Sequence, residues 1–178
     1  MRLLVAFISF FAATVPNVRA WAACSDFSWD VTHERTLWEG SAESLSAGTT
    51  VAAAPLIRAD RLYDLKLTTQ PRVQFSLPPG KAMLSDGAYA GLVRLHVTEG
   101  GSYRVSLDVP FWIDVVSSGK ELPTKDFQGQ RGCTGPHKMV EFVFPANQNL
   151  LLQFSGATAE ELHVSVTRTP PSQAKPLP

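Results

Sequence analysis

The feature that most constrains this chain is a regular alternation of residue types through its centre. Every odd position from Tyr103 to Val115 is apolar. The even positions in between hold polar residues, a proline and a tryptophan: Arg104, Ser106, Asp108, Pro110, Trp112 and Asp114. A period of two places alternate side chains on opposite faces of an extended backbone, so one face of this stretch is predicted to lie in a core. Because proline cannot donate to a β-ladder, we expect two strands here, or one strand bent at Pro110.

Shorter segments repeat the alternation along the rest of the chain. We predict strands at residues 27–31, 36–39, 62–67, 73–77, 92–97, 140–144, 150–154 and 162–166. Residues 41–58 and 121–137 lack the pattern and are predicted as covering loops, the first with room for a short strand. Since hardly any segment has a helical period, the fold class is all-β, an antiparallel β-sandwich or jelly roll of about 8–9 strands, with a closed barrel as the alternative.

Residues 1–22 have the pattern of a secretory signal peptide. Arg2 precedes a short apolar run, and Ala20 and Ala22 are the small residues expected before a cleavage point. No apolar run reaches the ~20 residues that a membrane span requires, so no transmembrane segment is predicted. We therefore expect a periplasmic or secreted protein with a single domain at 23–168 and a proline-rich tail at 169–178.

The two cysteines, Cys24 and Cys133, fit an exported protein. In an oxidising compartment an even pair predicts a disulfide, which here would close a long loop and contribute on the order of 4 kcal/mol. The alternative is a lipoprotein, because Cys24 directly follows Trp21-Ala22-Ala23 and so stands where a lipidated cysteine would.

The charge of the chain excludes one class of partner. The 16 basic residues balance 16 acidic ones, and they form no run or stripe. Removal of residues 1–22 would take away Arg2 and Arg19 and leave a slight acidic excess. No nucleic-acid partner is therefore expected.

Catalytic and metal sites find little support in the sequence. Of short metal-binding spacings such as HxH or HxxxE, the sequence has only His137 with Glu141, and in a strand these would lie ~13 Å apart. No G-x-S-x-G motif occurs, and Cys133 near His137 is more easily read as a bridged cysteine than as a nucleophile. Asp108 and Asp114 would be separated by roughly 20 Å along one ribbon, which indicates surface charge rather than a glycosidase pair. We therefore predict no catalytic residue, no metal and no cofactor.

Trp112 is the strongest candidate for binding. It lies in the outward phase beside Asp114, where an exposed indole next to a carboxylate could stack on a sugar ring or anchor a protein. The alternative is that Trp112 packs beneath the loop at 81–91 or the loop at 121–137. Those loops supply the polar residues expected around any site: Asp86, Tyr89, Asp126, Gln128, Arg131, His137 and Lys138.

The segments DGAYAGL, GGSYRVSLDVPFWIDVV and KDFQGQRGCTGPHKMVEFVFP resemble a family of small exported proteobacterial proteins of unknown function. The resemblance covers nearly all of the chain from CSDFSWDV onward. Both cysteines and PFWIDV recur in that family, which implies a structural link between Cys24 and Cys133. Some members carry the label homogentisate 1,2-dioxygenase, which would imply iron held by two histidines and a glutamate; this chain has no matching positions. The G-x-Y-x-V-x-L strand also resembles pre-peptidase C-terminal domains and carbohydrate-binding jelly rolls.

Together these observations predict an exported, non-catalytic β-sandwich that binds a carbohydrate or an envelope protein through Trp112, Asp114 and the neighbouring loops. Two alternatives remain open at this point. One is a metal-dependent jelly-roll enzyme of the dioxygenase-like kind, and the other is a structural component of an envelope assembly.

Overall fold

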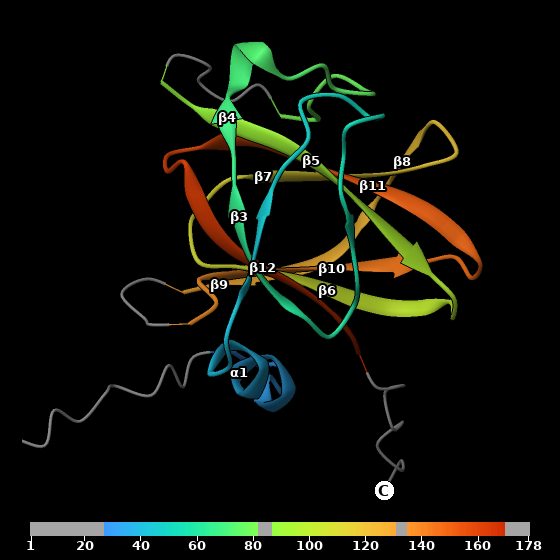
Figure 1. Ribbon diagram of the computed structural model, residues 1–178. Coiled ribbons are helices and arrows are strands. Elements are labelled where there is room, and N and C mark those ends of the chain that lie inside the picture. The colour runs from blue at the N-terminus through green and yellow to red at the C-terminus, as the bar shows by residue number, and fades with distance from the viewer. Residues whose placement is uncertain (1–26, 82–86, 131–134, 170–178) are drawn as a thin grey trace, which may run out of the picture.

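The computed structural model describes residues 27–81, 87–130 and 135–169, and two β-sheets packed face to face dominate it (Figure 1). The first sheet has the strand order β1 (Glu43–Ser46), β3 (Leu62–Lys66), β12 (Glu161–Arg168), β6 (Gly101–Leu107), β10 (Lys138–Phe144), β9 (Thr124–Gly129). The second sheet has the order β2 (Leu56–Ile57), β5 (Tyr89–Val97), β11 (Gln148–Ala157), β7 (Trp112–Ser117), β8 (Lys120–Leu122), and β4 (Thr68–Thr69) also pairs with β5. The predicted β-sandwich is therefore confirmed.

Two finer points of the predicted fold class are wrong. The described residues form 12 strands rather than about eight or nine, because residues 41–58 and 120–129, expected to be mainly loop, contribute β1, β2, β8 and β9. The sheets are mixed rather than antiparallel, since β1 pairs with β3 and β2 pairs with β5 in parallel. Both parallel pairs involve short edge strands, whose few residues carry too little pattern to be recognised in the sequence.

The central alternation forms two strands, as one of its two interpretations predicted. β6 ends at Leu107 and β7 begins at Trp112, and the two strands lie in different sheets. The odd-numbered apolar residues of both strands nevertheless meet in one core between the sheets: Tyr103, Val105, Leu107, Phe111, Ile113 and Val115. The chain crosses from one sheet to the other at Pro110, where a ladder could not continue.

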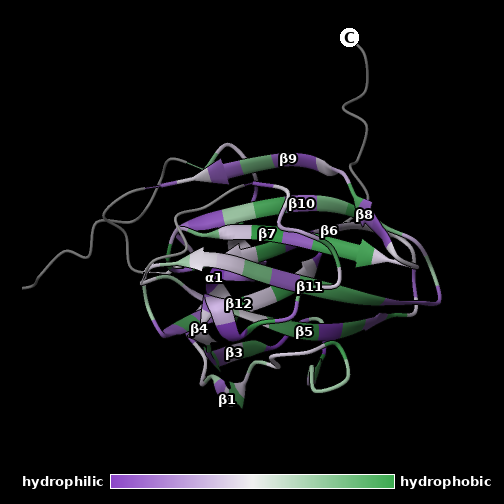
Figure 2. Cartoon of the chain, turned by 90° about the horizontal axis from the view of Figure 1, so that it is seen from above, coloured by the Kyte–Doolittle hydropathy of each residue, from purple (hydrophilic) through white to green (hydrophobic). Residues whose placement is uncertain are grey.

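The outer faces of both sheets are also covered. Helix α1 (Thr32–Trp38) packs beneath the first sheet, while the 3-10 turn η1 (Gln70–Arg72) and residues 73–80 cross the second sheet on its opposite side (Figure 1). A second apolar cluster lies under this crossing segment, formed by Ala54, Val73, Ala90, Leu92, Val116 and Leu151. Apolar residues therefore occur on both faces of these strands, and Figure 2 shows green bands along most of them.

Three predicted strands are absent: residues 27–31 form no strand, and the other two segments are linked to the sheets in other conformations. The strand predicted at 36–39 is replaced by α1, which spans residues 32–38 and whose Trp38 indole donates to Ser165 Oγ on β12 (2.9 Å). Residues 73–77 lie extended over the second sheet but join no ladder. The buried Gln153 side chain accepts hydrogen bonds from the N–H groups of Ser76 (2.7 Å) and Leu77 (3.2 Å) and so replaces a neighbouring strand.

Candidate ligand-binding site

One corner of the sandwich is open because the two sheets end differently there. In the first sheet, β9 runs beside β10 from Phe142 back to Lys138. In the second sheet, β8 pairs only with residues 115–117 of β7. Among the described strands, none therefore pairs with residues 112–114 of β7 on the side where β8 lies. Phe127 of β9 lies opposite the core residue Val140 and shares its inward face, yet it is 65% exposed. The second sheet does not extend far enough to cover this ring.

A groove of about 560 Å³ occupies this corner. Its walls come from the start of β7, from β9, from the start of β10 and from the end of the crossing segment: Lys81, Pro110, Phe111, Trp112, Ile113, Thr124, Phe127, Lys138 and Val140. We call it the Trp112 groove. Most of its lining is apolar, and its volume lies within the range of about 300–1,000 Å³ that small-molecule sites occupy.

The position of the Trp112 indole is fixed by Asp114. The indole N–H donates to Asp114 Oδ1 (2.6 Å), and Asp114 Oδ2 accepts a hydrogen bond from the Gly80 N–H (3.1 Å). Asp114 is only 3% exposed, so the prediction that it is a surface charge is wrong. A side chain at position 80 would start 2.9 Å from Asp114 Oδ1, which explains why a glycine fits this close approach. Trp112 is half-buried, part packed and part open to the groove.

Two lysines lie over the same indole. The Nζ atoms of Lys81 and Lys138 are each 5.6 Å from the centroid of the Trp112 ring. Lys138 Nζ also donates to the carbonyl oxygen of Phe111 (3.1 Å). Burial, with a smaller contribution from the charge of Lys81, lowers the pKa of Lys138 below its ordinary value. Within the described residues neither ammonium group has a carboxylate within 4.0 Å.

The other predicted site residues lie in several places. Tyr89 is in β5, partly buried against the core, and it does not line the groove. Asp126 is exposed on β9, where its carboxylate accepts the Phe127 N–H, and His137 is half-buried just before β10. Asp86, Arg131, Cys24 and Cys133 lie outside the described residues, so the disulfide stays a prediction.

Of the residues singled out in the sequence, the structure thus brings Trp112, Asp114 and Lys138 together. Sequence reasoning did not find Phe127 as a wall of the site, because it lies in a segment without a strand pattern. Lys81 was not predicted as a site residue either, although it is the first residue of the loop at 81–91, one of the two loops expected to cover Trp112.

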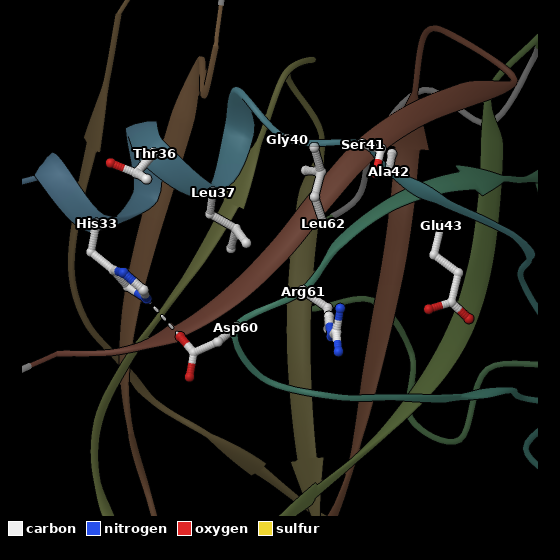
Figure 3. A pocket seen from close by; sticks show the side chains of 10 residues that line it. All are labelled: His33, Thr36, Leu37, Gly40, Ser41, Ala42, Glu43, Asp60, Arg61 and Leu62. Carbon is white, nitrogen blue, oxygen red and sulfur yellow. Dashed lines mark hydrogen bonds and ion pairs between the residues drawn. The ribbon is translucent and has the colours of Figure 1, made fainter.

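A second, more polar pocket of about 460 Å³ lies between α1 and the turn before β3 (Figure 3). Here His33 Nε2 lies 2.8 Å from Asp60 Oδ1, and both side chains are more than half exposed. Asp60 has a left-handed backbone conformation (φ 57°), and its N–H donates to the Val166 carbonyl. This pair joins the helix to the turn, and solvent screens it.

A similar contact joins His163 Nδ1 to Asp108 Oδ2 (2.8 Å), so Asp108 is held by a partner rather than free in solvent.

Among the residues that the structure describes, no three His, Cys, Asp or Glu side chains gather in a way that could hold a metal ion. Over the same residues, no helix has the length and apolar character needed to cross a membrane.

Fold and site together define a β-sandwich with an aromatic groove at one open corner. No known family model matches the chain, and comparison with curated proteins finds no match. The resemblance to small exported proteobacterial proteins therefore stays a prediction.

Proposed function

We propose that the protein is an exported, non-catalytic binding module that takes a small ligand into the Trp112 groove. The observation that carries this proposal is the exposure of Phe127, an aromatic ring that faces inward at a corner where only one of the two sheets continues. An exposed aromatic wall beside Phe111, Ile113 and Val140 costs free energy in water, and a ligand that covers it recovers that cost.

The polar groups of the groove favour binding over catalysis. They are the ammonium groups of Lys81 and Lys138, the Thr124 hydroxyl and the Trp112 indole N–H, and Asp114 already accepts the last of these. Such groups hold and orient a ligand, whereas acid–base or nucleophilic chemistry generally uses a carboxylate, histidine or cysteine aimed at the reacting atoms.

The two lysines of the groove affect whether a carbohydrate, the predicted ligand, can stack on Trp112. A sugar that stacks on an indole needs an open ring face. At Trp112 two ammonium groups lie 5.6 Å from the ring centroid, so a sugar would have to share or displace them. We therefore propose an apolar or amphipathic small molecule in preference to a neutral sugar, and we keep a neutral oligosaccharide as a probe in the tests.

A matched pair of variants tests the groove. Phe127→Ser removes the exposed wall, and Val143→Ser removes an equally exposed apolar residue (57%) on β10 that does not line the groove. Because the exposed part of a phenylalanine is worth about 1–2 kcal/mol when covered, Phe127→Ser should weaken ligand binding about 5- to 30-fold. Val143→Ser should leave it unchanged.

The measurement is isothermal titration calorimetry with a panel of small amphiphiles and neutral oligosaccharides, with circular dichroism to verify that both variants fold. Equal affinities in the two variants for every probe that binds, or no binding by any probe, would contradict the proposal.

A further inference from the structure

Two ammonium groups lie at the Trp112 groove. Lys81 and Lys138 approach the same indole, one from the segment that crosses the second sheet and the other from the first sheet. Neither forms an ion pair with a described residue. Burial removes hydration from the Lys138 ammonium group and the charge of Lys81 repels it, so both effects disfavour the charged form of Lys138.

The local charge indicates a monoanion. Asp114, bonded to the indole N–H, is a buried negative charge near the ring that both lysines approach. Glu121 also lies near Gly80 and, like Lys81, it is exposed, so solvent screens both of these charges. Because the buried Asp114 repels added negative charge, the groove fits a single carboxylate better than a doubly charged phosphate.

Resting on the function proposed above, we propose that the ligand of the Trp112 groove is an amphipathic carboxylate. Its head group binds between the ammonium groups of Lys81 and Lys138, and its apolar body covers Phe127 and Val140. The protein contributes a cation at one end of the groove and an aromatic wall at the other, which together select for a molecule with one charged end.

The head-group position is partly formed before the ligand arrives. Lys138 Nζ uses one of its three N–H donors on the Phe111 carbonyl, which holds the ammonium group at the groove, and the part of the chain that the structure describes shows no partner for the other two. A lysine that is already oriented loses less conformational entropy on binding. The ring face of the indole also attracts each of the two cations.

The test compares two probes with the same apolar body. Octanoate carries a carboxylate and octanamide a neutral amide, and each is titrated by calorimetry into the folded protein. A hydrogen bond to a charged partner is worth about 1.5–3 kcal/mol, so wild-type protein should prefer octanoate by roughly tenfold or more. Lys138→Met and Lys81→Met should each reduce that preference, because they lower octanoate affinity more than octanamide affinity. Lys120→Met, an exposed lysine on β8 outside the groove, is the matched control and should keep it.

The outcomes separate this inference from the proposed function. Equal affinity for the two probes, or a preference that survives both groove variants, would overturn the carboxylate head group while the groove still binds. If neither probe binds but a neutral oligosaccharide binds and loses affinity in Phe127→Ser, the carboxylate is also overturned and the function stands. If no probe distinguishes Phe127→Ser from Val143→Ser, both proposals fail.

Discussion

Removing the negative charge of Glu34 should destabilise the whole domain, because this residue fixes α1 to the first sheet. Glu34 is 3% exposed, and its Oε1 accepts from Arg104 Nη1 (3.2 Å) and from Thr167 Oγ1 (3.0 Å). The helix has only seven residues and no side-chain cap at its N-terminus, so it cannot persist without the sheet. The perturbation we propose is Glu34→Gln, which keeps the shape and removes the charge.

The size of this destabilisation depends on the contacts that Arg104 would retain in the variant. Breaking one partner of a buried ion pair costs about 3–5 kcal/mol when the remaining charge is left alone. Arg104 would keep the Asp30 carbonyl (2.7 Å), the Trp29 ring (4.6 Å) and, more distantly, Glu141 Oε2 (3.8 Å). The glutamine oxygen has two lone pairs and can still accept from Arg104 and Thr167, although without the negative charge. We therefore expect a loss of about 2 kcal/mol in the free energy of unfolding, below that range.

Urea denaturation followed by tryptophan fluorescence measures this loss. The control is Glu160→Gln, which breaks an ion pair with Lys66 (3.4 Å) whose side chains are half-exposed or more, and which should cost no more than about 0.5 kcal/mol. The double variant Glu34→Leu with Arg104→Met should recover most of the lost stability, since apolar residues can replace a buried pair. If Glu34→Gln costs no more than Glu160→Gln, the helix is not held by this pair.

Two further predictions concern the site and the segment that crosses the second sheet. Because burial lowers the pKa of Lys138 from its ordinary 10.5, the charged lysine costs stability below the lowered pKa, and this cost disappears as the pH rises to the ordinary value. Wild type should therefore gain stability relative to Lys138→Met between neutral pH and pH 10.5, measured by denaturation at a series of pH values; a constant difference would refute this. Gln153→Leu leaves two backbone N–H groups and a carbonyl of the crossing segment without their partner and should cost about 2–4 kcal/mol, with faster hydrogen exchange at residues 73–80. Unchanged exchange there would show that the side chain does not hold the segment.

The inner core could be predicted from the sequence because strand alternation is a local property. Val105 and Leu107 share a face whatever the rest of the chain does, and so do Ile113 and Val115. A one-residue slip would expose all of them, so the register is strongly specified. Pro110 lies between the two pairs, and its lack of an N–H donor by itself predicted that one β-ladder ends there. No distant information was needed for these features, and the core between the sheets contains the residues expected there.

The outer faces could not be predicted in the same way. Whether Arg104 or Asp114 meets water depends on whether another segment covers it, and both are in fact buried. The covering segments come from 70 positions earlier, where Glu34 reaches Arg104, and from 34 positions earlier, where Gly80 reaches Asp114. Apolar residues at outward positions, such as Val116, were the one local sign that a second layer exists.

For the candidate site, the sequence by itself determined that Trp112 and Asp114 share the outward face of one strand, because residues two apart in a strand always do. Only the tertiary structure decided that this strand begins at an open corner, that Phe127 remains uncovered there and that Lys81 and Lys138 meet over the indole. Alternation fixes the direction of each side chain relative to its own backbone. The lengths of β8 and β9 and the paths of distant segments fix what each side chain meets.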